Sequence, residues 1–119
     1  MVKRILIGLG LAIGLMVLVL RPVPIVSEEE ALVTKGVVAS IDEGGVKDVV
    51  FHLENSNRLF YINRGLEKGL KISRLQENLV GEKVTFKYPK YWTPLDWNGK
   101  TIHVSKVETK DEVIFNELK

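Results

Sequence analysis

The sequence predicts a mainly β domain behind one N-terminal transmembrane helix. Three observations indicate this class. A long apolar run opens the chain, several short segments alternate apolar and polar residues, and one later segment has a helical period. We expect residues 1–21 to form a membrane anchor, 22–31 a linker and 32–119 one small β domain. Fewer than 100 residues suffice for a single core.

Residues 5–20 are sixteen consecutive uncharged positions, preceded by Lys3 and Arg4 and followed by Arg21. A bilayer core of about 30 Å needs roughly 20 apolar residues in a helix, and basic side chains at both ends can cover the small deficit. We therefore expect an uncleaved anchor. The alternatives are a cleaved signal peptide and a buried helix of a soluble protein. A cleavage site after Ser27 would have Ile25 where a small residue is preferred.

The flanking charges predict how the helix is oriented. More basic residues precede the helix than follow it, so the positive-inside rule places the N-terminus in the cytoplasm. The domain is then expected outside the cell membrane, in the periplasm or the extracellular space. Gly10 and Gly14 form one G-x-x-x-G pair. The pair predicts either a helix-mediated dimer or a chance spacing, because glycine is common in membrane helices.

The charge balance argues against a nucleic-acid partner. The chain has a formal net charge of +2, but three of its basic residues belong to the anchor segment. Residues 22–119 hold fourteen Lys and Arg against fifteen Asp and Glu, a net charge of −1. A nucleic-acid-binding surface usually needs an excess of clustered basic residues. We expect a protein partner or a small ligand instead.

Composition and period divide the β domain into elements. Strands are expected at residues 32–42, 46–54, 59–63, 82–88, 100–108 and 112–116. Gly36 predicts a bend in the first strand. Ser73 opens an S-x-x-Q capping box, which predicts a short helix with Leu75 and Leu79 on its buried face and Gly81 at its end. The linker has two prolines and three consecutive glutamates, and we expect it to be solvated.

Three strands, one helix, two strands and a short terminal strand therefore follow one another. This order, the long glycine-bearing first strand and the place of the helix resemble the OB-fold, a five-stranded barrel. The resemblance covers residues 32–109, concerns the architecture only and identifies no characterised family. It implies a small OB-like barrel, and the alternatives are an SH3-like barrel and a small open sheet packed on one helix. The OB-fold hosts many functions, so the resemblance names no ligand.

The segment 89–99 is the most unusual part of the domain, because it contains Tyr91, Trp92, Asp96 and Trp97. In an OB-fold it would be the loop between the fourth and fifth strands, which commonly contacts ligands. Tyrosine and tryptophan offer stacking faces and a polar edge. We expect this loop to bind a ligand or a partner protein. Two alternatives stay open: the rings close one end of the barrel, or the tryptophans lie at the bilayer interface.

A second candidate surface follows the third strand. If Phe60 and Ile62 face the core, Tyr61 and Asn63 face outward on the surface that OB-folds use. Arg64 comes next and could pair with a carboxylate. We include Tyr61, Asn63 and Arg64 among the candidate ligand- or partner-binding residues. The alternative is a surface aromatic residue beside an exposed ion pair, which stabilises little.

No catalytic residue, metal ligand or cofactor is predicted. The two histidines, His52 and His103, are too few for a zinc site, and we expect them to be solvated. Residues 37–45 are similar to the first acidic turn of staphylococcal-nuclease-like domains. Those enzymes carry Asp-Gly-Asp there to hold calcium, whereas this chain has Asp42, Glu43 and Gly44. The absence of a recognisable nucleophile–base pair also argues against an enzyme.

The sequence thus predicts a membrane-anchored extracytoplasmic binding or interaction module. The alternative is a structural accessory subunit of a membrane protein complex, assembled through the transmembrane helix. A hydrolase is the third possibility.

Overall fold

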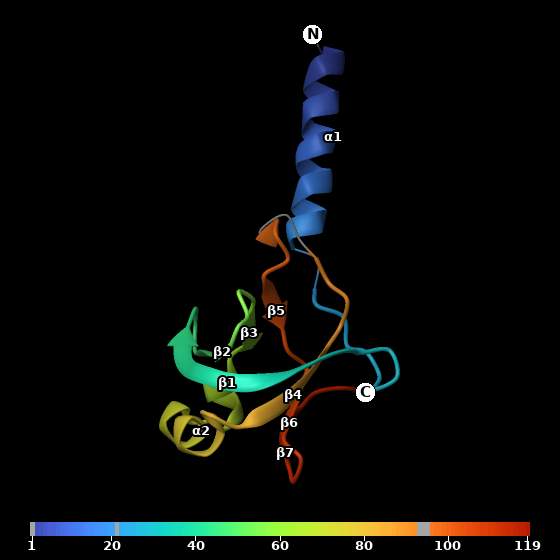
Figure 1. The fold of residues 1–119 in the computed structure, drawn as a ribbon. Coiled ribbons are helices and arrows are strands. Elements are labelled where there is room, and N and C mark those ends of the chain that lie inside the picture. The colour runs from blue at the N-terminus through green and yellow to red at the C-terminus, as the bar shows by residue number, and fades with distance from the viewer. Residues whose placement is uncertain (1, 21, 93–95) are drawn as a thin grey trace.

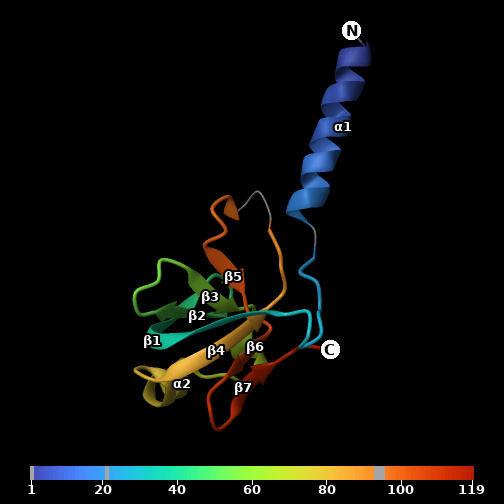
Figure 2. The same cartoon turned by 45° about the vertical axis from the view of Figure 1, so that its right-hand side comes forward.

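The computed structural model describes residues 2–20, 22–92 and 96–119. Helix α1, Val2–Val19, projects from the β domain (Figures 1 and 2). Its 18 residues span about 27 Å at 1.5 Å per residue. None of the described residues of α1 is buried, so the alternative of a core helix is wrong. The helix is long and apolar enough to cross a membrane, although a signal sequence has the same properties.

The described residues form one mixed, open sheet of seven strands. They are β1 (Leu32–Gly44), β2 (Asp48–Leu53), β3 (Leu59–Ile62), β4 (Lys83–Tyr88), β5 (Thr101–His103), β6 (Lys106–Glu108) and β7 (Val113–Asn116). Their order in the sheet is β5-β3-β2-β1-β4-β6-β7. The mainly β prediction is confirmed. The predicted closed OB-like barrel is not confirmed, because the sheet ends at β5 on one side and at β7 on the other.

Strand β1 is long enough to pair with a different strand along each half of its length, and it is irregular in its middle. Its first half pairs with β4 and its second half with β2, both antiparallel. The β2 pairing shifts register between Val38 and Ser40. Nearby, a Cβ on Gly36 would lie 2.8 Å from Leu53 Cδ1, so a larger residue there would require the Leu53 side chain to shift. The sequence-based expectation of an irregularity near Gly36 agrees with this shift.

The predicted strand at 100–108 is instead two strands that lie in different parts of the sheet. β5 pairs in parallel with β3, and β6 pairs antiparallel with β4. Between them, the Val104 amide donates to the Tyr61 carbonyl (2.8 Å) and the Ser105 amide donates to the Lys87 carbonyl (2.9 Å). The chain therefore crosses from β3 to β4 within two residues, which interrupts one regular strand.

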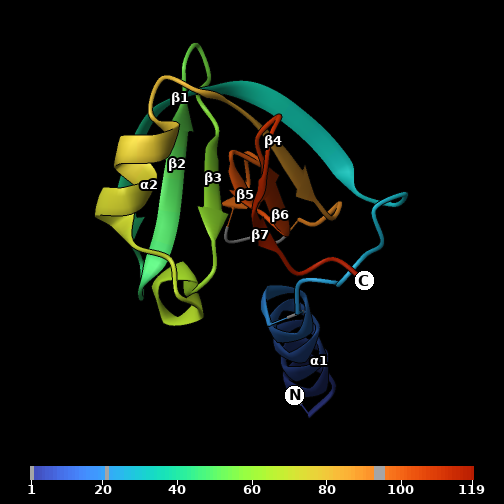
Figure 3. The ribbon, with the colours of Figure 1, turned by 90° about the horizontal axis from the view of Figure 1, so that it is seen from below.

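Two short helical segments lie between β3 and β4. The 3₁₀ helix η1, Gly65–Lys68, ends at Gly69 in the left-handed region. Helix α2, Ile72–Leu79, packs against β1 and lies at one edge of the domain (Figure 3). Leu75 and Leu79 are buried as predicted. The predicted Ser73 cap is wrong: Lys71 is the N-cap residue and makes no side-chain cap hydrogen bond, so Ser73 lies inside the helix.

The core is built from alternate residues of the strands. Phe60 stacks on Phe86 with 4.7 Å between ring centroids, and Phe51 meets the same ring edge-on at 5.2 Å. All three side chains are fully buried. The other apolar residues of the core are Val38, Ile41, Val49, Leu53, Ile62, Leu75, Leu79, Val84, Tyr88, Val104 and Val107. The alternation predicted for β2, β3 and β4 is confirmed.

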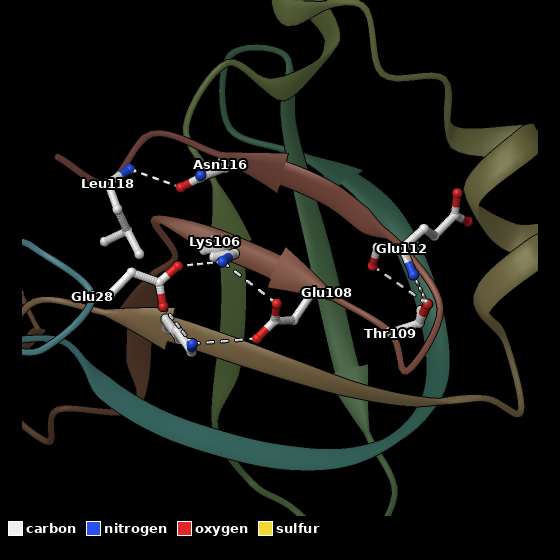
Figure 4. A network of polar contacts seen from close by, with 8 residues as sticks. Glu28, Lys106, Glu108, Thr109, Glu112, Asn116 and Leu118 are labelled. Carbon is white, nitrogen blue, oxygen red and sulfur yellow. Dashed lines mark hydrogen bonds and ion pairs between the residues drawn. The ribbon is translucent and has the colours of Figure 1, made fainter.

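Residues 22–31 form neither a helix nor a strand, but they are attached to the domain. Glu28 accepts hydrogen bonds from Lys87 and Lys106, and both lysines also pair with Glu108 at 3.4 and 3.5 Å (Figure 4 labels Glu28, Lys106 and Glu108). The Lys119 amide donates to the Val26 carbonyl at 3.0 Å. The linker is therefore attached to the domain at Glu28 and Val26, although the Glu28 side chain stays 43% exposed, as expected of a solvated linker.

The ion pairs shift the pKa values of Glu28, Lys87 and Lys106. Hydrogen bonds from Lys106 and then Lys87 hold the pKa of Glu28 below its usual range. The hydrogen bond to Glu28 raises the pKa of Lys106 and of Lys87. The Lys106 side chain is only 10% exposed, so its charge needs these partners.

Candidate functional site

The parallel pairing of β5 with β3 brings together the two candidate surfaces predicted from the sequence. Tyr61 in β3 lies opposite His103 in β5, and the aromatic loop 89–99 leads directly into β5. Consequently the end of this loop must lie beside β3. The loop and Tyr61 are 30 residues apart in the chain but adjacent in the domain.

A pocket of about 500 Å³ lies where the loop, β3, β5 and the end of α1 meet. Four of the seven predicted residues line it, namely Tyr61, Tyr91, Trp92 and Asp96. The other lining residues are Val19, Val23, Leu32, Arg58, Tyr88, Pro89, Lys90, Thr101, Ile102 and His103. Because Val19 ends α1 and Val23 follows it, the pocket sits at the end of the domain from which the helix emerges.

The two tryptophans of the chain contact each other at this end. Their ring centroids are 5.4 Å apart and their planes are inclined by 64°. Trp92 Nε1 also donates to the Trp97 carbonyl at 3.3 Å. Trp92 is 42% exposed and Trp97 is 75% exposed. These exposed fractions argue against the alternative in which the two tryptophan rings close one end of the barrel. Trp97 lies outside the described lining of the pocket.

Asp96 is held in place by the turn that follows the loop. Its carboxylate oxygen Oδ2 accepts from the Thr101 amide at 3.0 Å, and its carbonyl accepts from the Gly99 amide at 3.1 Å. Gly99 adopts a φ of +64°, a conformation that glycine adopts without strain. This turn fixes the carboxylate at the edge of the pocket, near the start of β5.

Tyr61 is the central residue of this region, because it lines the main pocket and two smaller adjoining hollows. Burial raises the pKa of the Tyr61 hydroxyl, and the charges of Asp48, Tyr91 and Asp96 raise it further. Tyr61 therefore remains a neutral phenol that can donate a hydrogen bond.

Arg58, Lys90 and His103 line the pocket but were not among the predicted site residues. The Arg58 guanidinium lies 5.2 Å from the centre of the Phe60 ring, and its Nη2 donates to Thr34 Oγ1 at 3.3 Å. These contacts orient the charge of Arg58. Lys90 is exposed and adds a second positive charge. His103 is brought to the pocket by the pairing of β3 with β5, which no local sequence signal indicates. Lys90 and Arg58 lie close in the sequence to predicted site residues, but their charge alone did not distinguish them.

His103 is nearly buried, so the expectation that it is a solvated histidine is wrong. Its side chain is 11% exposed, and Nε2 lies 3.1 Å from Glu117 Oε1. Its ring also meets Tyr61 edge-on at 5.4 Å. The histidine thus supports the position of Tyr61. His52, by contrast, is partly exposed and lies 3.8 Å from Asp42.

Asn63 and Arg64 are placed outside the described lining of the main pocket. Asn63 lines the two smaller hollows beside Tyr61, which have volumes of about 390 and 320 Å³. The Arg64 guanidinium pairs with Glu67 at 3.7 Å, and the Arg64 amide donates to Asp48 at 2.8 Å. This exposed ion pair is the one that the alternative expected for Arg64, and it lies at the turn after β3.

The polar groups in and around the pocket largely have structural partners. Among the described residues, no group of three or more His, Asp or Glu side chains is placed to hold a metal ion. Compared with known protein families, curated proteins and solved structures, the chain matches none of them. Its function must therefore be argued from the geometry of the pocket.

Proposed function

We propose that this protein is a membrane-anchored binding module whose recognition site is the pocket around Tyr61. The observation that carries the proposal is the convergence of Tyr61, Tyr91, Trp92 and Asp96, from two separate segments, on one pocket of about 500 Å³. A pocket of this size is in the usual range for small-molecule sites. We propose binding and not catalysis, because Asp96 and His103 are engaged by Thr101 and Glu117.

In this proposal α1 stays attached and spans the cell membrane. The basic residues Lys3 and Arg4 precede the helix, which supports a cytoplasmic N-terminus and a domain on the outer side. The domain would then meet ligands of the periplasm or the extracellular space.

An OB-like architecture is the finer fold that we propose for the domain. The antiparallel neighbours β1–β2, β2–β3 and β1–β4, the parallel pair β3–β5, and a helix between β3 and β4 support it. The crossing at Val104 and Ser105 would be the point where the barrel comes nearest to closure. OB-folds bind ligands on the face of their second and third strands and on the loop before the fifth, which is where this pocket lies.

The chemistry of the pocket favours a ligand with a flat face and a negative group. Four aromatic side chains offer stacking surfaces, and the Tyr61 hydroxyl offers a hydrogen bond. Arg58 and Lys90 contribute two positive charges against the single carboxylate of Asp96. An acidic sugar or a peptide carrying a carboxylate meets these requirements.

Site-specific cross-linking tests the proposal on the full-length protein in its own membrane. A photoreactive benzoylphenylalanine in place of Thr101, whose exposed side chain lines the pocket, would report on the pocket. One in place of Lys110 would report on the exposed turn between β6 and β7 at the opposite end. We expect a discrete adduct from position 101 only, and its loss in the Arg58→Ala and Tyr61→Ser variants. Equal adducts at both positions, or an adduct that survives both substitutions, would contradict the proposal.

A second candidate function is that of an accessory subunit held in a complex by α1. The observation that favours it is the open surface of the helix, where nothing lies within 4 Å of a Cβ built on Gly10 or Gly14. Replacing α1 by an unrelated transmembrane helix separates the two candidates. Cross-linking at position 101 would survive the replacement if the pocket carries the function. The activity of the complex would be lost if α1 holds the protein in the complex.

A further inference from the structure

Trp97, which contacts Trp92 but lies outside the described lining of the pocket, is the strongest feature that the binding pocket leaves unexplained. Trp97 is 75% exposed and Trp92 is 42% exposed, although tryptophan buries more apolar surface than other residues when it is covered. Each ring is held by the other and by the hydrogen bond from Trp92 Nε1 to the Trp97 carbonyl. The pair is thus fixed in position without being enclosed by the domain.

The pair also lies next to the end of the apolar helix. Val19, the last residue of α1, and Trp92 line the same pocket. In Figures 1 and 2 the segment that leads into β5 lies at the level of the lower end of α1. Because α1 is about 27 Å long and the hydrocarbon core is about 30 Å thick, Val19 falls at the boundary between hydrocarbon and headgroups.

We propose that Trp97, supported by Trp92, rests in the headgroup layer of the membrane from which α1 emerges. This layer is about 5–7 Å thick on each side of the core, so side chains next to Val19 lie within it. Tryptophan is enriched at this depth because its ring is apolar and its indole N–H is polar. The inference rests on the proposed anchoring by α1 and is independent of what the pocket binds.

The charges around the pair suit a lipid surface. Lys90 and Lys100 flank the loop on both sides and are exposed, so each can approach lipid phosphates. The one acidic residue described in the loop, Asp96, directs a carboxylate oxygen to the Thr101 amide. The exposed apolar rings therefore have basic neighbours on either side, as expected of a contact with headgroups.

Tryptophan fluorescence tests the inference directly, because both tryptophans of the chain lie in this loop. The full-length protein is reconstituted at one chain per nanodisc, with phosphatidylcholine and phosphatidylglycerol as the lipids. Lipids brominated near the headgroup quench indoles that touch the membrane, whereas iodide quenches those in water. In the Trp92→Phe variant, we expect Trp97 to lose most of its fluorescence to brominated lipid and little to iodide.

A matched control moves the reporter to the far end of the domain. Lys110 lies in the exposed turn between β6 and β7, opposite α1 in Figure 1. In a Trp92→Phe, Trp97→Phe, Lys110→Trp variant we expect strong quenching by iodide and none by brominated lipid. If Trp97 behaves like this control while the protein remains embedded in the nanodisc, the inference is wrong. Release of the protein from the disc would contradict the anchoring instead.

Discussion

Two groups of aromatic residues in this small domain lie in opposite environments. Phe51, Phe60 and Phe86 form a fully buried stack between the strands. Trp92 and Trp97 form a pair of similar geometry that remains exposed at the end nearest α1. The first group stabilises the fold because it removes apolar surface from water. The second group buries less apolar surface, and in our proposal Trp97 contacts the membrane instead.

The comparison predicts the largest difference for substitutions to alanine. Phe86→Ala removes a ring that two others contact, and should lower the free energy of unfolding by about 3–5 kcal/mol. Trp97→Ala should lower it by less than about 1 kcal/mol, because most of that ring is already in solvent. Urea unfolding of the detergent-solubilised protein, followed by circular dichroism, measures both. Similar losses for the two variants would remove the basis of the comparison.

A methyl group added to the core should also be costly. A Cβ on Gly65 would lie 2.7 Å from Val49 Cγ2 and 3.2 Å from Ile62 Cγ2, and both side chains are fully buried. We expect Gly65→Ala to lower the free energy of unfolding by about 1–3 kcal/mol. Adding Val49→Ala should restore space, so the double variant should lose less than the sum of the two single losses. Strict additivity would show that Gly65 is not tightly packed.

Because the linker is attached through ion pairs, its contribution to the free energy of unfolding should depend on pH, whereas that of the apolar core should not. Because the pKa of Glu28 is lowered in the folded protein, its ion pairs contribute stability above its ordinary pKa of 4.5 and lose it as pH falls below that value. We expect Glu28→Gln to be less stable than the wild type at neutral pH, with the difference shrinking in acid. Unfolding in urea at several pH values measures it. A difference that stays constant with pH would rule out the ion pairs as its source.

The smallest effect is expected at Ser73, which contributes to neither group of aromatics. Since Lys71 is the N-cap of α2, the Ser73 hydroxyl caps no helix end. Ser73→Ala should change the free energy of unfolding by less than about 0.5 kcal/mol, whereas loss of a true serine cap costs about 0.5–2 kcal/mol. A loss of 1 kcal/mol or more, measured by the same urea unfolding, would show that Ser73 caps the helix after all.

Local patterns in the sequence were enough to predict the core, because strand alternation depends on neighbours two residues apart. Val49, Phe51 and Leu53 illustrate this, and all three are buried. Contacts between distant segments could not be predicted in the same way. The division of 100–108 into β5 and β6 depends on partners in β3 and β4, and the pairing of Glu28 with Lys106 joins residues 78 positions apart.

In the candidate site, too, residues that a local pattern marks were predicted, whereas a residue brought in by contacts between distant segments was not. The composition of the loop was sufficient to select Tyr91, Trp92 and Asp96, and outward alternation selected Tyr61. His103 was missed because it becomes a neighbour of Tyr61 only when β5 pairs with β3. Asn63 and Arg64 were selected from the same segment but lie in the turn that follows β3, outside the described lining of the main pocket.

The attachment of Glu28 and Val26 to the domain has a consequence for how the protein searches for a ligand. A flexible linker of about ten residues would have a root-mean-square end-to-end distance of roughly 17 Å, so the domain could move by that distance from the end of α1. Bound to Lys106 and Lys119, the linker cannot act as such a tether. In the proposed membrane-anchored arrangement, the pocket would therefore stay close to the lipid surface and move within a plane. Ligands that are themselves confined to that membrane surface meet it at a higher effective concentration than ligands arriving from the bulk solution.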